Sequence, residues 1–291
     1  MISKLRILRN PLRRFCSNLH NDLMNDYLEE DHQQYNRHIK KVNLYNFEPI
    51  TQNICNISPT AVLIGEVMIE TESFVGNFSV IRGDLNAVKI EQHAIITENC
   101  SVSTVSELDK TGQEAMTYIS TECMIMPGAN LISSDLERGV TVGANSVVCE
   151  GSKLGEFAVI GANSVVPPYR YIPGHQLWTG NPVRFVKDLS KQEVTSVRVY
   201  KKFLIKSKYS EVQDDHFNNT AFIQKKELDD IEIILKDHNV TLEELEETLA
   251  KMKGESLHIY MDPKIVELAQ QRVAQLKARN QESITESVKS S

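Results

Sequence analysis

The sequence predicts a mainly β protein with α extensions, a left-handed parallel β-helix of about six coils followed by helices. Two observations predict this fold: an aliphatic residue recurs every six positions, and a small residue or a proline often follows it. A period of six fits neither an α-helix nor a simple amphipathic strand. It fits a solenoid, in which repeats of fixed length stack coil on coil. The longest unbroken run is Leu136, Val142, Val148, Leu154, Ile160, Val166 and Ile172.

The repeat divides the 291-residue chain into three regions. Residues 1–50 are an N-terminal extension, residues 51–185 the β-helix domain, and residues 186–291 a C-terminal helical region. The period breaks twice, at Arg82 to Val88 and at Ser106 to Tyr118, and we expect the second break to be an excursion loop. A loop that leaves a solenoid carries function or is a tolerated insertion, and both interpretations stay open. The earlier repeat positions are Ile57, Leu63, Ile69, Val75, Ile81, Ile90, Ile96, Val102, Ile119, Ile125 and Leu131.

Helices are expected after the repeat, because capping signals and apolar stripes replace the period of six. The residues after Gln281 are rich in Ser, Glu and Lys, and we expect them to be frayed. The apolar stripes have to bury against this chain or against another subunit. The expected helices begin after Ser190 and end near Tyr209, cover residues 221–238, begin after Thr241, and run from Pro263 to about Arg279.

Charge and cysteine content restrict the function. A net charge of −7 argues against nucleic acid as the main partner. No apolar run approaches the roughly 18 residues that a transmembrane helix needs. The five scattered cysteines fit reduced thiols better than a disulfide framework. Residues 1–21 carry five basic residues and no acid, which resembles a mitochondrial targeting segment, although a basic arm that contacts an acidic neighbour or lipid head groups is the alternative.

The segment VIRGDLNAVKIE, residues 80–91, resembles a signature of the γ-class carbonic anhydrases. The segment IPGHQLWTGNPVRFV resembles the end of the β-helix in the same family, although hexapeptide acyltransferases share its Gly-Asn-Pro step. The resemblance covers roughly Pro59 to Glu193. It implies a trimer of prisms, in which Arg82 and Asp84 form ion pairs at the trimer interface.

The zinc ligands of that family have no counterpart here. Three histidines hold the catalytic zinc in the family, and Ser103, Pro127 and Ile132 stand at the matching positions. The resemblance therefore implies no catalytic, cofactor-binding or metal-binding residue in this chain, and zinc only at an interface between partner subunits. His93 and His175 are expected on the surface, more than four coils apart. Cys100 and Cys123 lack the spacing of replacement ligands.

The resemblance implies a non-catalytic γ-carbonic-anhydrase-like subunit of a heterotrimer attached to mitochondrial NADH dehydrogenase, complex I. Its expected partners are related γ-carbonic-anhydrase-like subunits and membrane-arm subunits, on the matrix side of the inner membrane. One alternative is a hexapeptide-repeat interaction subunit of another assembly, similar to the pointed-end subunits of dynactin. Another is an acyltransferase of the same fold, which needs a general base, usually histidine, that the excursion loop lacks.

Overall fold

A computed structural model describes residues 38–44, 47–52, 55–108, 115–210, 220–252, 254–256 and 258–289. The targeting-like segment, residues 1–21, lies outside them, and so do residues 109–114 of the expected excursion loop. Residues 40–291 form one compact unit.

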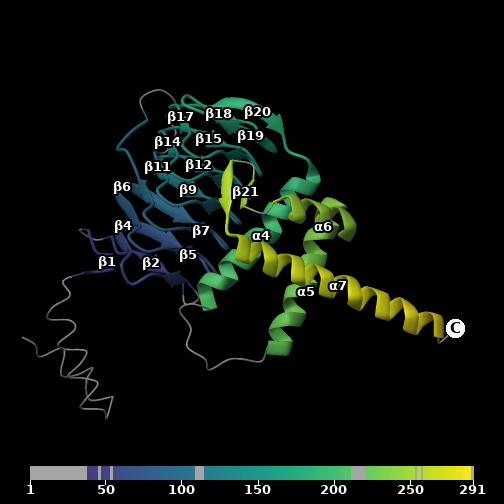
Figure 1. Cartoon of the computed structure of the whole chain (residues 1–291). Helices are drawn as coiled ribbons and strands as arrows, with labels where there is room; N and C mark the ends of the chain where they lie inside the picture. Colours follow the sequence, from purple (N-terminus) through teal and green to yellow (C-terminus); the bar gives the residue numbers. More distant parts are fainter. Residues whose placement is uncertain are drawn as a thin grey trace, which may run out of the picture. The chain divides into compact units, whose positions relative to one another are not determined.

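The repeat region forms a parallel β-solenoid with three faces (Figure 1). Long strands β4 (Val62–Ile69) and β6 (Val80–Ile90) each cross the corner between the first and second faces, and β1 (Lys41–Val42) and β2 (Ile50–Thr51) pair with β4. The first face continues with β8 (Ser101–Ser103), β11 (Asn130–Ile132), β14 (Val147–Val148) and β17 (Val165–Val166). The second face continues with β9 (Thr117–Ile119), β12 (Asp135–Leu136), β15 (Lys153–Leu154) and β18 (Tyr171–Ile172). The third face consists of β3 (Asn56–Ile57), β5 (Phe74–Val75), β7 (Ile95–Ile96), β10 (Met124–Ile125), β13 (Thr141–Val142), β16 (Val159–Ile160) and β19 (Gln176–Thr179), with β20 (Arg184–Asp188) antiparallel to β19.

Inward side chains stack from turn to turn, which explains the period of six. On the first face Leu63, Ile81, Val102, Leu131, Val148 and Val166 are successive register partners. The matching stacks are Ile69 to Ile172 on the second face and Ile57 to Trp178 on the third. Burial of one such side chain contributes about 1.5–3 kcal/mol, so the stacks are the main source of stability.

The solenoid has about seven turns, so the expected number of about six was too low. Seven parallel strands build the third face, and Trp178 lies over Ile160 as the last member of its stack. An aromatic residue at a stacking position escapes a search for aliphatic residues, which is why the last turn was missed. The left-handed sense of the coil stays a prediction.

Within the described residues, four helices follow the solenoid: α4 (Lys191–Ser210), α5 (Thr220–His238), α6 (Leu242–Lys251) and α7 (Pro263–Lys289). Both expected capping boxes are confirmed, at Ser190 with Glu193 and at Thr241 with Glu244. The expectation for α7 was wrong, because the helix continues ten residues past Arg279. After Pro263 the sequence contains no further Pro and no Gly that would end it. The hairpin of β21 (Gly254–Ser256) and β22 (Ile259–Met261) was not expected.

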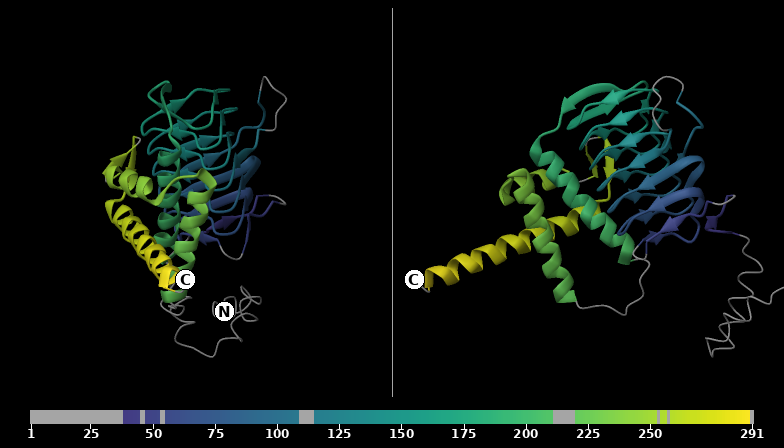
Figure 2. Two further views of the ribbon diagram at one scale, coloured as in Figure 1. Left: turned by 90° about the vertical axis from the view of Figure 1, so that its right-hand side faces the viewer. Right: turned by 180° about the vertical axis from the view of Figure 1, so that it is seen from behind.

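The helices cover the third face of the solenoid (Figure 2). Outward residues of this face, among them Phe74, Ile95 and Met124, form one buried apolar cluster with Val197 and Phe203 of α4. The apolar stripes of the helices therefore bury against this chain. In the part of the chain that the structure describes, no helix has the length and apolar character needed to cross a bilayer.

Truncation of a stacking residue should test the register directly. Leu131 is fully buried in the first-face stack, so we expect Leu131→Ala to lower the free energy of unfolding by about 2–5 kcal/mol. Leu85→Ala is the control, because Leu85 is 59% exposed, and it should cost less than about 0.5 kcal/mol. Urea denaturation measures both, and equal losses would contradict the stacking.

Candidate functional site

The outward rows of the three faces have different chemistry. The row on the third face is apolar and lies under the helices. Half of the residues in the row on the second face are charged, and the register partners of this row are Met68, Lys89, Tyr118, Asp135, Lys153 and Tyr171. The row on the first face has no charge, and its register partners are Val62, Val80, Ser101, Asn130, Val147 and Val165. A second outward row of this face contains Arg82, the register partner of Ile64. A partly buried face that carries so little charge and that no described element covers is the best candidate for an interaction site.

Two of the three positions of the missing histidines lie together on this first face. Ser103 of β8 and Ile132 of β11 are direct register partners and are both partly exposed. Pro127 lies exposed at the corner between the third and first faces, five residues before Ile132. A hydroxyl, a proline ring and a sec-butyl group do not make a zinc site. Among the described residues, no three His, Cys, Asp or Glu side chains are grouped so that they could hold a metal ion.

The break in the period at Arg82 is a bulge within β6 rather than a loop. Gly65 pairs with Gly83 and Val67 pairs with Val88, so β6 carries three more residues than β4 at this corner. Both glycines are required by the close approach of the two strands. A Cβ on Gly65, where φ is +74°, would lie 2.3 Å from the Gly83 carbonyl oxygen, and a Cβ on Gly83 would lie 2.2 Å from that of Glu66.

The bulge presents Arg82 and Asp84 at the edge of the first face. Arg82 Nη2 and Asp84 Oδ2 form an ion pair at 2.5 Å, with side chains 52% and 21% exposed. Beside them Leu85 is 59% exposed. The two residues expected at a trimer interface are thus adjacent and accessible, and their role at that interface stays a prediction.

Asn86 joins the bulge to the excursion loop, a connection that sequence reasoning missed. Its side-chain Nδ2 donates to the carbonyl oxygens of Val105 at 2.6 Å and Ser106 at 3.0 Å, and its backbone N–H donates to Thr104 Oγ1. Ser133 Oγ accepts from the backbone N–H of Val105 and donates to the Ala115 carbonyl, so it links both ends of the loop. The one signal in the sequence that could have indicated this connection is an asparagine inside the interrupted part of the repeat. These bonds hold the bulge and the loop ends at one corner.

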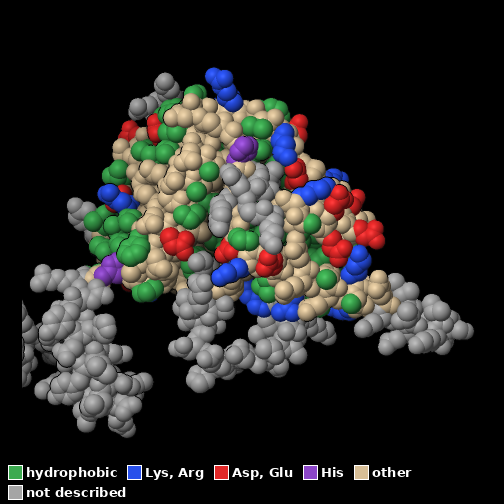
Figure 3. All heavy atoms as spheres, viewed as in Figure 1, with side chains coloured by type: hydrophobic (Ala, Val, Ile, Leu, Met, Phe, Trp, Pro, Cys, Tyr) green, Lys and Arg blue, Asp and Glu red, His purple; other side chains and the backbone are tan. Residues whose placement is uncertain are grey.

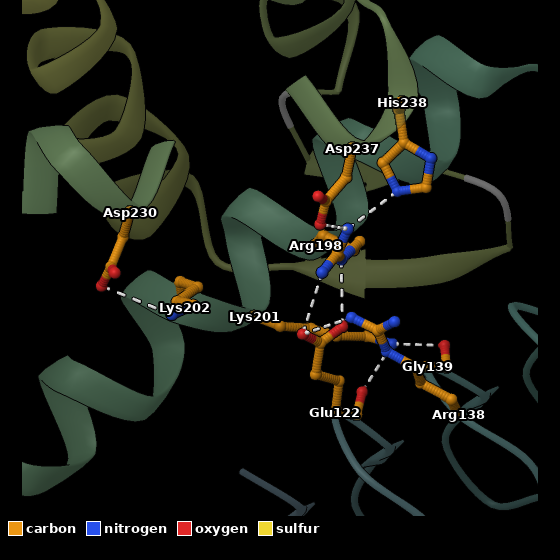
Figure 4. A network of polar contacts seen from close by, with 9 residues as sticks. All are labelled: Glu122, Arg138, Gly139, Arg198, Lys201, Lys202, Asp230, Asp237 and His238. Atoms are coloured by element: carbon orange, nitrogen blue, oxygen red, sulfur yellow. Dashed lines mark hydrogen bonds and ion pairs between the residues drawn. The ribbon is translucent and has the colours of Figure 1, made fainter. Parts of the chain in front are cut away.

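A second polar cluster anchors α4 to the solenoid (Figure 4). Arg198 of α4 donates to both carboxylate oxygens of Glu122, at 3.0 and 2.9 Å. Lys201 donates to the backbone carbonyls of Glu122, Gly139 and Val140. Burial lowers the pKa of Lys201 to about 8. Burial alone would raise the pKa of Glu122, but the hydrogen bonds and charge of Arg198 outweigh it and lower that pKa. No motif in the sequence indicates this cluster.

The remaining histidines and cysteines lie where packing explains them. His93 Nδ1 lies 3.0 Å from Glu72 Oε2 with its side chain 34% exposed, and His175 is exposed. The residues at the equivalent corner of successive turns are His93, Glu122, Gly139, Phe157 and His175. The two histidines are therefore four turns apart rather than more than four. Burial raises the pKa of the Cys100 thiol to about 11 and that of Cys123 to about 12. Both thiols are therefore protonated at neutral pH, which does not suit metal ligands.

Comparison with known proteins places the repeat region in a family. No family model matches the chain. The carnitine operon protein CaiE of Proteus sp. (strain LE138) is 30% identical over 156 residues, which cover 53% of this chain and 76% of that protein. The chain belongs to the hexapeptide-repeat family of γ-carbonic-anhydrase-like and CaiE proteins. Another member, γ carbonic anhydrase 1, mitochondrial, of Arabidopsis thaliana, is 27% identical over 57% of this chain, a match that spans only 60% of that protein.

Solved structures confirm the fold of this family member. A putative acetyltransferase of Bacillus cereus superposes with a TM-score of 0.56 at 19% identity, over 60% of this chain and 98% of that chain. A hexapeptide transferase family protein of Anaplasma phagocytophilum superposes with a TM-score of 0.54 at 20% identity, over 59% and 97%. At these identities the likeness shows the solenoid alone.

The Glu122–Arg198 pair should make stability pH-dependent. We expect Glu122→Gln to lower the free energy of unfolding by about 3 kcal/mol at neutral pH, because the buried Arg198 would keep only the more exposed Asp237 as a charge partner. The pKa of folded Glu122 is lowered, so its contribution is present above the unfolded pKa of about 4.3 and is lost as the pH falls through the lower folded value. Urea denaturation should therefore show wild type and variant converging in acid.

The matched control for this pair is Asp229→Asn, which removes an ion pair to Arg279 whose side chains are 49% and 45% exposed. It should change the free energy of unfolding by less than about 1 kcal/mol. A difference between wild type and Glu122→Gln that is constant with pH would contradict the assigned role of the charge.

Thiol reactivity should separate the buried cysteines from the others. At about pH 8 we expect iodoacetamide to leave Cys100 and Cys123 unmodified in the native protein, because both are buried and their pKa values are raised. Cys149 and Cys55 are partly exposed and should react, slowly because burial raises their pKa values as well. Peptide mass spectrometry reads the modified sites. Rapid modification of Cys123 in the folded protein would contradict the structure.

Proposed function

We propose that this chain is a non-catalytic γ-carbonic-anhydrase-like subunit, kept for assembly of a trimer attached to mitochondrial NADH dehydrogenase. The observation that carries the proposal is the first face. One of its outward rows is uncharged, Ser103 and Ile132 occupy positions where the family has zinc ligands, and the Arg82–Asp84 pair stands at its edge. Such a surface suits the flat side of another solenoid better than it suits metal chemistry.

The composition of the trimer follows from the shared nature of the family's zinc site. Ligands come from two neighbouring subunits, so a chain without ligands disables both interfaces that it touches. Three copies of this chain would then bind no zinc between them. We therefore propose a heterotrimer with two related subunits, in which zinc has at most one place, between those partners.

The proposed location rests on the relatives and on the N-terminal charge pattern. Two relatives are named mitochondrial γ carbonic anhydrases, and residues 1–21 are basic and acid-free. We propose the matrix side of the inner membrane, with the membrane-arm subunits of NADH dehydrogenase as neighbours. Affinity purification of the full chain from mitochondria tests this: recovery of dehydrogenase subunits with γ-carbonic-anhydrase-like proteins supports the proposal, and recovery of neither contradicts it.

Acyl transfer is the second candidate function, because the two superposed proteins are a putative acetyltransferase and a hexapeptide transferase family protein. An open cavity beside the excursion loop offers a place for a ligand, and its lining includes Leu108, Tyr118, Asp135 and Lys153. Histidine, the usual base of such enzymes, is not among the described residues that line it. Acetyl-CoA protection of the chain against heat would favour this function. The dynactin-like interaction subunit stays the third alternative, and copurified subunits distinguish it.

A charge in the middle of the first face should block assembly. We expect Ile132→Arg to weaken binding of the partner subunits at least tenfold, because the guanidinium would be desolvated without a carboxylate. The fold should persist, since Ile132 is partly exposed and lies outside the stacks. Met68→Arg, which adds a charge on the second face at a side chain 39% exposed, is the matched control and should bind normally. Quantitative pull-down measures both, and equal binding by Ile132→Arg would contradict the proposed face.

A further inference from the structure

The last turn of the solenoid is unusual in its charge. The chain has a net charge of −7, yet no acidic residue lies between Glu156 and Asp188. This stretch contains Arg170, Arg184 and Lys187. Lys187 forms an ion pair with Glu193, whereas Arg170 and Arg184 form none with a carboxylate of the described residues. The end of the solenoid therefore presents two arginines whose charge is not neutralised within the described chain.

Contacts around the last turn gather these arginines with the buried Trp178 and the exposed Phe185. The Arg170 guanidinium lies 5.4 Å from the centre of the Trp178 ring, and Phe185 packs edge-on against that ring at 5.9 Å. Arg184 is the register partner of Thr179, the residue after Trp178. Together these side chains cover the hydrophobic core of the solenoid at its last turn. We call this surface the capped end: Tyr169, Arg170, Tyr171, Arg184, Phe185 and Val186.

The capped end exposes apolar surface beside its positive charge. Tyr171 is 60% exposed, Phe185 48%, Val186 46% and Tyr169 37%. Figure 3 shows basic and hydrophobic side chains next to one another at the end of the solenoid that carries β18 and β20. All five residues of β20 are exposed, so no described element covers this end.

We propose that the capped end docks on the surface of an anionic lipid bilayer. Tyrosine and other aromatic rings are favoured at the level of lipid head groups, where their apolar and polar parts are both accommodated. Arginine near an anionic leaflet gains roughly a fivefold increase in affinity per residue. The arrangement needs no groove, because single apolar side chains stand exposed on the last turn beside the two arginines.

A bilayer explains the capped end better than an acidic protein does. Protein partners are held at closely packed apolar patches, and the first face, which carries little charge, is the surface of that kind here. At the capped end the apolar residues stand among charged and polar neighbours instead. This inference goes beyond the proposed assembly role and does not depend on it.

Vesicle flotation with the full chain tests the proposal. Vesicles of phosphatidylcholine alone are compared with vesicles that contain about one third phosphatidylserine. We expect binding to the anionic vesicles only, and a loss of about 30-fold for the double variant Arg170→Gln, Arg184→Gln. The double variant Tyr171→Ser, Val186→Ser should also weaken binding severalfold, because these exposed side chains contribute apolar area and have no packing role.

Two matched controls remove the same groups elsewhere. Lys236→Gln with Lys264→Gln deletes two exposed charges on the helices, and Phe78→Ser with Ile233→Ser deletes side chains 66% and 56% exposed. Both should bind anionic vesicles like wild type. The basic residues 1–21 are present in every variant, so only differences between variants bear on the capped end. Circular dichroism and thermal melting confirm that each variant is folded.

Each outcome either supports or overturns the proposed docking on a lipid bilayer. Loss of vesicle binding in the capped-end variants alone supports the proposal. Equal binding by all variants, equal binding to neutral vesicles, or no binding by wild type overturns it. Loss of partner subunits with unchanged vesicle binding also overturns it, because the capped end is then a protein interface. Subunit capture by Ile132→Arg is measured separately, so failure of the lipid proposal is distinguishable from failure of the assembly role.

Discussion

Each turn of this solenoid has to place an inward side chain over the one before it, on three faces at once. Residues that are added inside a strand would break all three stacks, so extra residues fit only at corners. The bulge of β6 and the excursion loop both leave at the corner between the first and second faces. The register on both sides is kept, with Ile81 paired to Val102 and Ile90 to Ile119. The faces consequently stay regular enough to pack against flat neighbours.

The same regularity separates the roles of the three faces. The third face is closed by helices of the same chain, and Arg198 and Lys201 fix the position of α4 through buried contacts. The second face carries the charged residues Lys89, Asp135 and Lys153 and suits contact with water. The first face is left partly exposed and carries little charge apart from Arg82. Because the helices bury their apolar stripes on their own solenoid, they need no partner to cover these stripes, and the first face is the surface that we propose for contacts with other subunits.

Features set by local sequence could be predicted, and those set by distant contacts could not. The stacking positions and both capping boxes depend on residues a few positions apart, and the structure confirms them. Trp178 was missed because an aromatic residue continues an aliphatic stack. Glu122 and Arg198 are 76 positions apart and no repeat links them, so their pairing depends on where α4 docks. The candidate positions Ser103, Pro127 and Ile132 came from the family resemblance, and the register of β8 and β11 brings two of them together.

We propose that this solenoid, which lacks the zinc ligands, is kept for assembly with related subunits. Native mass spectrometry of the purified assembly measures this most directly, since one spectrum gives the subunits and the bound metal. We expect one copy of this chain with two related solenoid subunits and no more than one zinc ion. A homotrimer of this chain that holds zinc at its interfaces would contradict it.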